Sequence, residues 1–154
     1  MKKLLIVLLF FQAGGFVYAQ PKNKYQGFPS LVWPKLYDIQ YEKAFDDNGE
    51  YDKPIFSAAA KSLAGKSVVL PGYMVPFDNG TKGTVFMLTS LPLNACFFCG
   101  VGGPESVVQV FLKSTVTYTE KPIEVKGVLR LNDKNPDLMI YTLEQAEFLG
   151  TIDF

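Results

Sequence analysis

The sequence predicts a mostly β protein, a small five-stranded antiparallel barrel with one short helix. Five segments are rich in β-branched and aromatic residues, turn-forming residues separate them, and a Pro-Gly pair interrupts the first segment. A chain of 154 residues that is 48% hydrophobic can fill one compact core. A β-sandwich is the alternative, because periodicity does not distinguish a sheet that closes on itself from two sheets that stack.

The predicted strands lie at hairpin spacing in the second half of the chain. Pro71 and Gly72 fall inside the first of them and indicate a sharp bend, as at a barrel corner. Turn residues at 78–83 and 132–137 supply hairpin connections, and residues 144–154 provide one more short strand or a docked tail. This pattern favours an OB-like barrel. The five strands are expected at residues 67–77, 84–90, 107–112, 123–131 and 138–143.

The first half of the chain is expected to contribute less regular structure. Residues 36–43 are predicted to form a short edge strand, because a proline just before them argues against a central one. Trp33 is expected in the core. One short helix is predicted within residues 54–65, with Ser57 near its start and a glycine at its end.

The N-terminus has the three parts of a secretory signal peptide. Lys2 and Lys3 precede an unbroken apolar run at 4–11, and small residues follow up to Ala19. The apolar run is too short for a permanent membrane span. We therefore expect cleavage after Ala19 and a periplasmic or secreted protein without a stable membrane anchor. Residues 20–154 would form a single barrel domain with an N-terminal extension.

Charge and composition exclude several classes of function. Removal of the signal leaves 13 basic against 15 acidic residues, which argues against nucleic acid as a partner. The absence of histidine excludes Ser-His and Cys-His nucleophile pairs. A non-catalytic binding or accessory protein is therefore favoured over an enzyme. Convergence of Glu105, Glu124 and Asp133 in a pocket, with perturbed pKa values, would favour an enzyme instead.

The two cysteines, Cys96 and Cys99, lie in a loop between two predicted strands. One interpretation is a local disulfide in an oxidising compartment, which would make the loop a purely structural interaction module. A second is thiol–disulfide exchange, although the glycines after Cys99 do not favour the helix start that would activate a thiolate. We expect the two thiols to act as one unit at the loop surface.

A third interpretation is a metal site for zinc or copper(I). Two thiolates suit a soft metal, and Glu105 is close enough in the chain to fold back as an oxygen ligand. Structural zinc normally takes four ligands, so a four-sulfur site shared by two copies in a homodimer is a further arrangement. Because only free thiolates bind metal, oxidation and metal binding exclude each other.

The remainder of the loop is rich in glycine. Gly100, Gly102 and Gly103 permit positive φ and close approach of a partner, so backbone N–H groups can form an anion-binding nest. The alternative is that these glycines simply permit a tight connection between barrel strands. Pro104 and Ser106 complete the loop before the next strand.

Four short motifs resemble a family of small bacterial secreted or periplasmic domains of unknown function. They are Leu-Ala-Gly-Lys at 63–66, Gly-Tyr-x-x-Pro at 72–76, Phe-Met-Leu at 86–88 and the Ala-Cys loop at 95–106. The resemblance covers about the last two thirds of the chain. It implies an OB-like barrel, metal handling and an association with ABC-type transport systems. The implied partner is a transport-system or envelope protein.

The cysteine loop departs from the pattern of that family, which runs Ala-Cys-Ile-His, then a proline run, then Asn-Gln. Phe98 stands at the histidine position, Cys99 is an addition, and Glu105 and Ser106 replace Asn-Gln. We therefore expect Cys99 to take the role of the missing imidazole.

Overall fold

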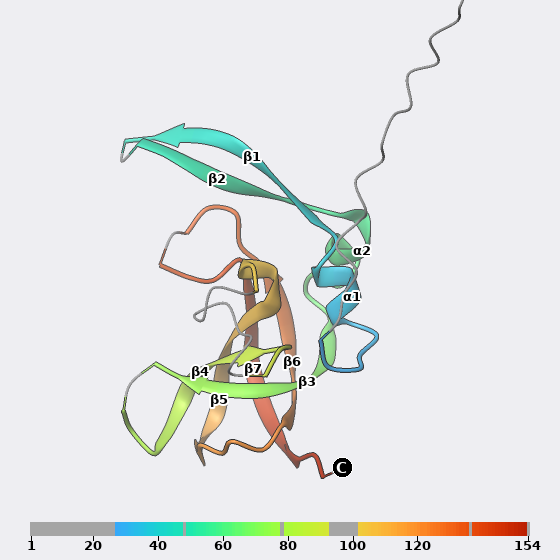
Figure 1. The fold of residues 1–154 in the computed structure, drawn as a ribbon, viewed down its shortest axis with the longest axis vertical. Coiled ribbons are helices and arrows are strands. Elements are labelled where there is room, and N and C mark those ends of the chain that lie inside the picture. Colours follow the sequence, from blue (N-terminus) through green and yellow to red (C-terminus); the bar gives the residue numbers. More distant parts are fainter. Residues whose placement is uncertain (1–26, 48, 78, 93–101, 136, 154) are drawn as a thin grey trace, which may run out of the picture.

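The computed structural model describes residues 27–47, 49–77, 79–92, 102–135 and 137–153. Its main body is a closed barrel with the strand order β3-β4-β5-β7-β6, from which a two-stranded hairpin projects (Figure 1). The predicted small five-stranded barrel is confirmed, and closure of the sheet excludes the β-sandwich. The barrel strands are β3 (Ser67–Pro76), β4 (Lys82–Thr89), β5 (Val107–Thr117), β6 (Ile123–Leu131) and β7 (Tyr141–Thr151).

The strand pairing is mixed and not wholly antiparallel as expected. Four neighbouring pairs are antiparallel, whereas β5 and β7 run parallel, with Gln109 opposite Thr142 and Leu112 opposite Ala146. β7 lies between β5 and β6, so its insertion closes the barrel. Alternation of apolar residues indicates which face of a strand is buried, but it carries no information about which strand lies next to it.

The predicted bend lies at Pro71 and Gly72. Up to Gly72, β3 pairs with β6, and from Tyr73 onward it pairs with β4. A Cβ atom on Gly72 would lie 2.5 Å from the carbonyl oxygen of Thr89, so the close approach of the two strands requires glycine here.

The core fills the barrel and continues into the short helix α1 (Trp33–Leu36) at one end of it. Trp33 and Leu36 are fully buried, so the expectation for Trp33 is confirmed. They pack with the barrel's inward-facing side chains, which include Leu70, Met74, Phe86, Leu88, Val108, Val110, Val125, Leu129 and Leu143.

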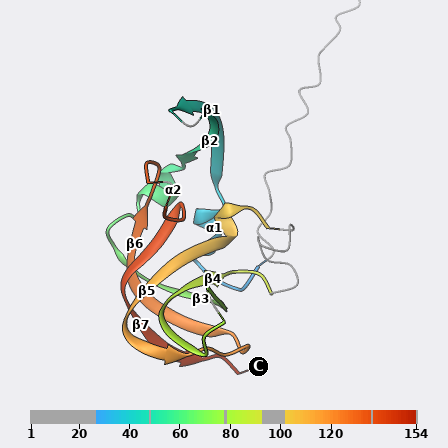
Figure 2. The same cartoon turned by 90° about the vertical axis from the view of Figure 1, so that its left-hand side faces the viewer.

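The strands β1 (Ile39–Asp46) and β2 (Gly49–Phe56) form an antiparallel hairpin, which we call the hairpin arm. Figures 1 and 2 show that it extends from the barrel end that carries α1, away from the C-terminus. The edge strand predicted at 36–43 is present, but its bounds are wrong, and it pairs with a second strand that was not predicted. Pro54, expected near a helix start, instead lies in β2 opposite Tyr41. It is tolerated because a two-stranded ribbon has only edge strands.

Two further elements differ from prediction in their bounds. The helix α2 (Ala58–Lys61) is shorter than 54–65 but has the expected cap, since Ser57 Oγ accepts a 3.1 Å hydrogen bond from the N–H of Ala60. β7 begins at Tyr141 and continues to Thr151, well beyond the predicted 138–143.

The predicted signal peptide at 1–19 lies outside the described residues, so cleavage and the domain span of 20–154 stay predictions. Within the described ranges, no helix has the length and apolar character needed to cross a membrane.

Candidate functional site

The candidate site surrounds Glu105, which lies in the short 3-10 helix η3 (Pro104–Ser106) between the cysteine loop and β5. Pro104 starts this turn, as proline commonly does at the first position of a helix. The Glu105 side chain is partly exposed, whereas Ser106 is fully buried. The sequence therefore places one carboxylate at the barrel surface immediately before a buried strand.

Hydrogen bonds fix η3 against the end of β4. The N–H of Ser90 donates to the carbonyl oxygen of Ser106 at 3.0 Å, which joins the two ends of the connection that contains the cysteines. Ser106 Oγ donates to the carbonyl oxygen of Gly103 at 2.6 Å. Tyr37 Oη lies 2.9 Å from Ser90 Oγ in a hydrogen bond, so the residue after α1 also braces this region.

The hairpin arm contributes a contact of its own to Glu105. Tyr41 in β1 donates a hydrogen bond from its phenolic O–H to Oε2 of Glu105, with 3.2 Å between the two oxygens. The contact joins residues 64 positions apart in the chain. At the base of the same arm, Phe56 packs against Tyr141 with 5.5 Å between ring centroids. The site thus lies where the arm meets the barrel.

Gly102 and Gly103 do not have the positive φ that glycine permits and that one interpretation of the loop invoked. Each is instead approached closely by a side chain of η3. A Cβ atom on Gly102 would lie 2.6 Å from Ser106 Oγ, and one on Gly103 would lie 2.6 Å from Cδ of Glu105. The glycines leave room for the chain's own side chains, which favours the tight-connection interpretation over an anion nest at these two positions.

Three tyrosines around Glu105 have pKa values above that of a free tyrosine. Burial raises the pKa of Tyr41 above its ordinary value, and the charge of Glu105 and the hydrogen bond to it raise this pKa further. Burial is also the main cause of the raised pKa of Tyr141, with smaller contributions from the ionised forms of Tyr41 and Glu105. Burial raises the pKa of Tyr37 as well, against the opposing hydrogen bond with Ser90. At neutral pH these phenols are hydrogen-bond donors and not bases.

The remaining predicted loop residues, Cys96, Cys99 and Gly100, lie outside the described residues. Their disulfide, thiol and metal interpretations therefore stay predictions. Within the described part of the chain, no group of three or more Cys, Asp or Glu side chains is arranged to hold a metal ion.

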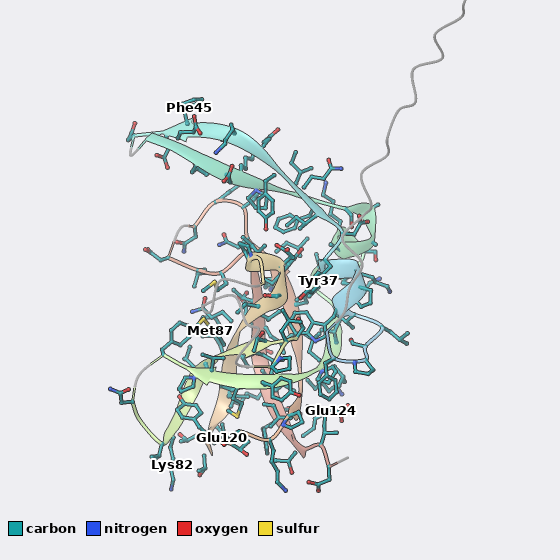
Figure 3. The ribbon with its side chains drawn as sticks, viewed as in Figure 1. Tyr37, Phe45, Lys82, Met87, Glu120 and Glu124 are labelled. Atoms are coloured by element: carbon teal, nitrogen blue, oxygen red, sulfur yellow. The ribbon has the colours of Figure 1, made fainter. Side chains whose placement is uncertain are left out.

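The three carboxylates singled out from the sequence do not converge in one place. Glu124 lies near the start of β6, toward the barrel end that is farther from the hairpin arm (Figure 3). Asp133 follows the other end of β6, so the length of that strand separates it from Glu124. The convergence that would have favoured an enzyme is not found among these three.

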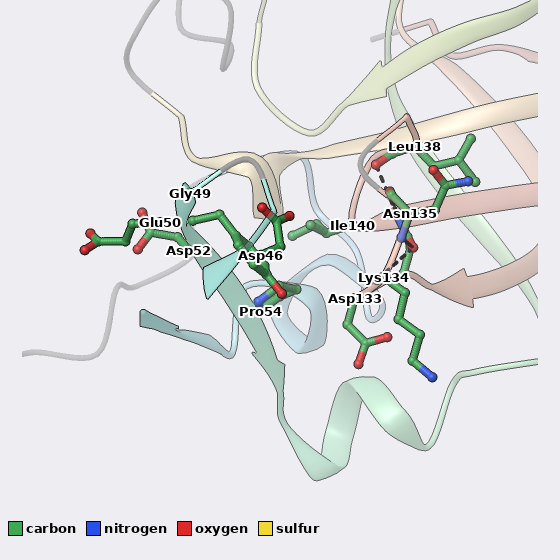
Figure 4. A pocket seen from close by; sticks show the side chains of 12 residues that line it. Asp46, Gly49, Glu50, Asp52, Pro54, Asp133, Lys134, Asn135, Leu138 and Ile140 are labelled. Atoms are coloured by element: carbon green, nitrogen blue, oxygen red, sulfur yellow. Dashed lines mark hydrogen bonds between the residues drawn. The ribbon is translucent and has the colours of Figure 1, made fainter. Parts of the chain in front are cut away.

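Asp133 instead lines a cleft of about 430 Å³ between the hairpin arm and the turn at 132–140 (Figure 4). Asn132 braces that turn, since its Nδ2 donates to the carbonyl oxygens of Asn135 at 2.7 Å and Leu138 at 3.1 Å. On the arm side, the cleft is lined by Asp46, Glu50, Tyr51, Asp52 and Pro54. Lys43 forms 3.0 Å ion pairs with both Glu50 and Asp52. Two of the acidic lining residues are therefore already paired within the arm.

Sequence reasoning missed Tyr41 as a site residue. A tyrosine in an alternating strand is typical of a sheet surface, and no local pattern indicates a contact with a residue 64 positions away. The sequence contains only a weak indication of this role for Tyr41. It is an aromatic residue with a polar end, in a strand next to a segment that proline interrupts.

The fold and site define a small β-barrel protein with a partly exposed carboxylate held by a tyrosine. The chain belongs to the family described as "Protein of unknown function (DUF3299)", whose model matches residues 35–148. It is similar to the crystal structure of a DUF3299 family protein from Pseudomonas aeruginosa PAO1, with 23% identity and a TM-score of 0.48. That match covers 61% of this chain and 66%, just under two thirds, of the other. No curated protein matches the chain.

Proposed function

We propose that this protein is an exported, non-catalytic binding protein that holds a thiophilic metal ion, zinc or copper(I), at its cysteine loop. Cys96 and Cys99 would supply two thiolates, and Glu105 would supply an oxygen ligand. The observation that carries the proposal is the position of the Glu105 carboxylate, partly exposed and held by Tyr41 at the exit of that loop.

The anchoring of the loop supports this assignment. The bond between Ser90 and Ser106 brings its two ends together, and only five residues separate Cys99 from Glu105 in the chain. Residues this close in the chain to Glu105 would need only a short loop closure to bind one ion together with it. A hard oxygen next to two soft sulfurs is a donor set that zinc accepts, because zinc binds both types.

The electrostatics support a binding role over acid–base chemistry. A general base near neutral pH needs a pKa close to 7, whereas the pKa values of Tyr37, Tyr41 and Tyr141 are all raised above that of a free phenol. Tyr41 can orient the Glu105 carboxylate by donating its O–H, and none of the three phenols accepts a proton at pH 7.

We infer the setting of this function from the sequence and the fold together. The closed five-stranded barrel supports an OB-like assignment. The signal-like N-terminus supports a periplasmic or secreted location, and the family resemblance supports a transport-system or envelope protein as partner. A homodimer that shares four sulfurs is an alternative stoichiometry, distinguished by the metal content per chain.

Metal competition on reduced protein tests the proposal. The chain from residue 20, purified without air, is titrated against a chromophoric chelator with zinc and, separately, with copper(I). We expect one ion per chain, or one per two chains for the shared site. Cys96→Ser and Cys99→Ser should each weaken binding by more than about tenfold, whereas the matched carboxylate control Glu124→Gln should not change it.

Two results would contradict the metal assignment. Indifference of the reduced thiols to both metals would eliminate the metal interpretation, and two thiols that are freely alkylated in protein isolated without a reductant would eliminate the disulfide interpretation. A pair that binds no metal but exchanges rapidly with a disulfide reagent would favour thiol–disulfide chemistry instead.

A further inference from the structure

We propose that Tyr41 and Gly103 are positioning residues that together form a seat for the Glu105 carboxylate and hold it ready for a cation. This inference rests on the proposed function, and it assigns roles to two residues outside the ligand set itself. It also makes the hairpin arm a part of the site, because Tyr41 belongs to β1.

The first side of the seat is the tyrosine. Tyr41 lies opposite Pro54 in the arm, two residues along β1 from Ile39, whose partner Phe56 is buried. Because side chains two residues apart share a face, Tyr41 lies on the face of the arm that packs toward the barrel. Its O–H donates to Oε2 of Glu105. From the residues that the structure describes, Oε1 of Glu105 accepts no hydrogen bond and can serve a ligand.

The second side of the seat is the space above Gly103. Both carboxylate oxygens of Glu105 lie where a side chain at Gly103 would begin, closer than a Cβ atom would allow. Gly103 has φ −84° and ψ 175°, an extended conformation that any residue adopts. A side chain at Gly103 would therefore displace the Glu105 carboxylate from this position, whereas the backbone conformation itself would accept any residue.

Fixing the carboxylate in advance favours binding. A free glutamate loses rotamer freedom when it ligates a metal, and a side chain already held in place loses less. A hydrogen bond to one oxygen also orients the other toward the ion, in the way that outer-shell partners orient metal ligands. We expect loss of either side of the seat to weaken metal binding about tenfold.

Three variants separate the seat from general effects on stability. Tyr41→Phe removes only the phenolic O–H, and Gly103→Ala places a methyl group where the carboxylate lies. Tyr51→Phe is the matched control, because Tyr51 is also in the arm and is 39% exposed against 38% for Tyr41. The seat predicts weaker zinc affinity for the first two variants and unchanged affinity for Tyr51→Phe. In a Glu105→Gln background, Tyr41→Phe should have no further effect.

A titration without metal makes the seat testable independently of the proposed function. Tyrosine ionisation, followed by ultraviolet absorbance, should shift to lower pH in Glu105→Gln, because the charge of Glu105 raises the pKa values of Tyr37, Tyr41 and Tyr141. The shift should be smaller when Glu105→Gln is made in the Tyr41→Phe background, because Tyr41 is the phenol that donates its O–H to Glu105. An unchanged titration in Glu105→Gln, or unchanged zinc affinity in Tyr41→Phe, would overturn the seat. Failure of the unaltered protein to bind either metal would overturn the proposed function while the titration still decides the seat.

Discussion

The indole N–H of Trp33 donates a 2.7 Å hydrogen bond to the carbonyl oxygen of Pro71. This buried contact joins the helix that closes one end of the barrel to the bend at which β3 changes partners from β6 to β4. A side chain from α1, outside the barrel strands, thus stabilises the corner on which the barrel depends.

Trp33→Phe should lower the free energy of unfolding by at least about 2 kcal/mol. The smaller ring leaves a cavity in a fully buried site and removes the donor to Pro71. Urea unfolding followed by circular dichroism measures the change, since the only tryptophan is lost. Phe77→Leu is the control: Phe77 is 51% exposed, and its change should stay within about 0.5 kcal/mol.

Gly72→Ala should destabilise the fold by about 1 to 3 kcal/mol, because the added Cβ meets a backbone oxygen that cannot move aside as a side chain can. Val69→Ala on the same strand removes a side chain that is 39% exposed and should cost less. Equal destabilisation by the two substitutions, measured by thermal unfolding, would show that the close approach to Thr89 is not what requires glycine.

The barrel could be predicted from the sequence because its signals are local. Alternation, turn residues and the Pro71-Gly72 bend each lie within a few residues of the structure they specify. The hairpin arm was missed because its strand β2 contains Pro54, which resembles a helix start when the edge position is not known. The parallel pairing of β5 with β7 was missed because strand order depends on the global packing of the chain.

The site was predictable only in part, because contacts between residues far apart in the chain leave no local pattern in the sequence. Glu105 was identified because it follows the cysteines in the chain, whereas Tyr41 reaches it through tertiary structure. For Gly103 the sequence left an anion nest and a tight connection open, since sequence alone does not reveal which side chain will lie next to a glycine.

The raised pKa values of the buried tyrosines predict a loss of stability in alkali. The folded chain holds the protons of Tyr37 and Tyr141 more tightly than the unfolded chain, whose tyrosines ionise near pH 10. Their contribution to the free energy of unfolding is fully present below about pH 10. It is lost as the pH rises through the pKa values that the two tyrosines have in the folded chain. Urea unfolding at a series of pH values should show a decline that begins near pH 10.

The double variant Tyr37→Phe and Tyr141→Phe isolates these phenols. Lys43 also has a raised pKa, from its hydrogen bonds to Asp52 and Glu50. It therefore adds to the loss of stability in alkali equally in the double variant and in the unaltered chain. Above pH 10, the free energy of unfolding of the double variant should therefore fall less steeply with pH than that of the unaltered chain. Identical slopes above pH 10 would mean that the two phenols ionise as freely in the folded state as in the unfolded one.

Export should produce a mature chain that begins at Gln20. The charged start, apolar run and small residues up to Ala19 lead to this expectation. Intact-mass spectrometry of the protein recovered from the periplasm or medium of an expressing bacterium checks it. Recovery of a chain that still carries residues 1–19 would remove the compartment argument on which the redox and metal alternatives rest.

X-ray absorption spectroscopy of the zinc-loaded, reduced protein tests the central claim most directly. A site formed by Cys96, Cys99 and Glu105 predicts two sulfur neighbours at about 2.3 Å and an oxygen shell at about 2.0 to 2.2 Å. That oxygen shell should change in Glu105→Gln but not in Glu124→Gln. A spectrum with no sulfur neighbours, or one that Glu105→Gln leaves unaltered, would contradict the assignment of the cysteine loop and Glu105 as one metal site.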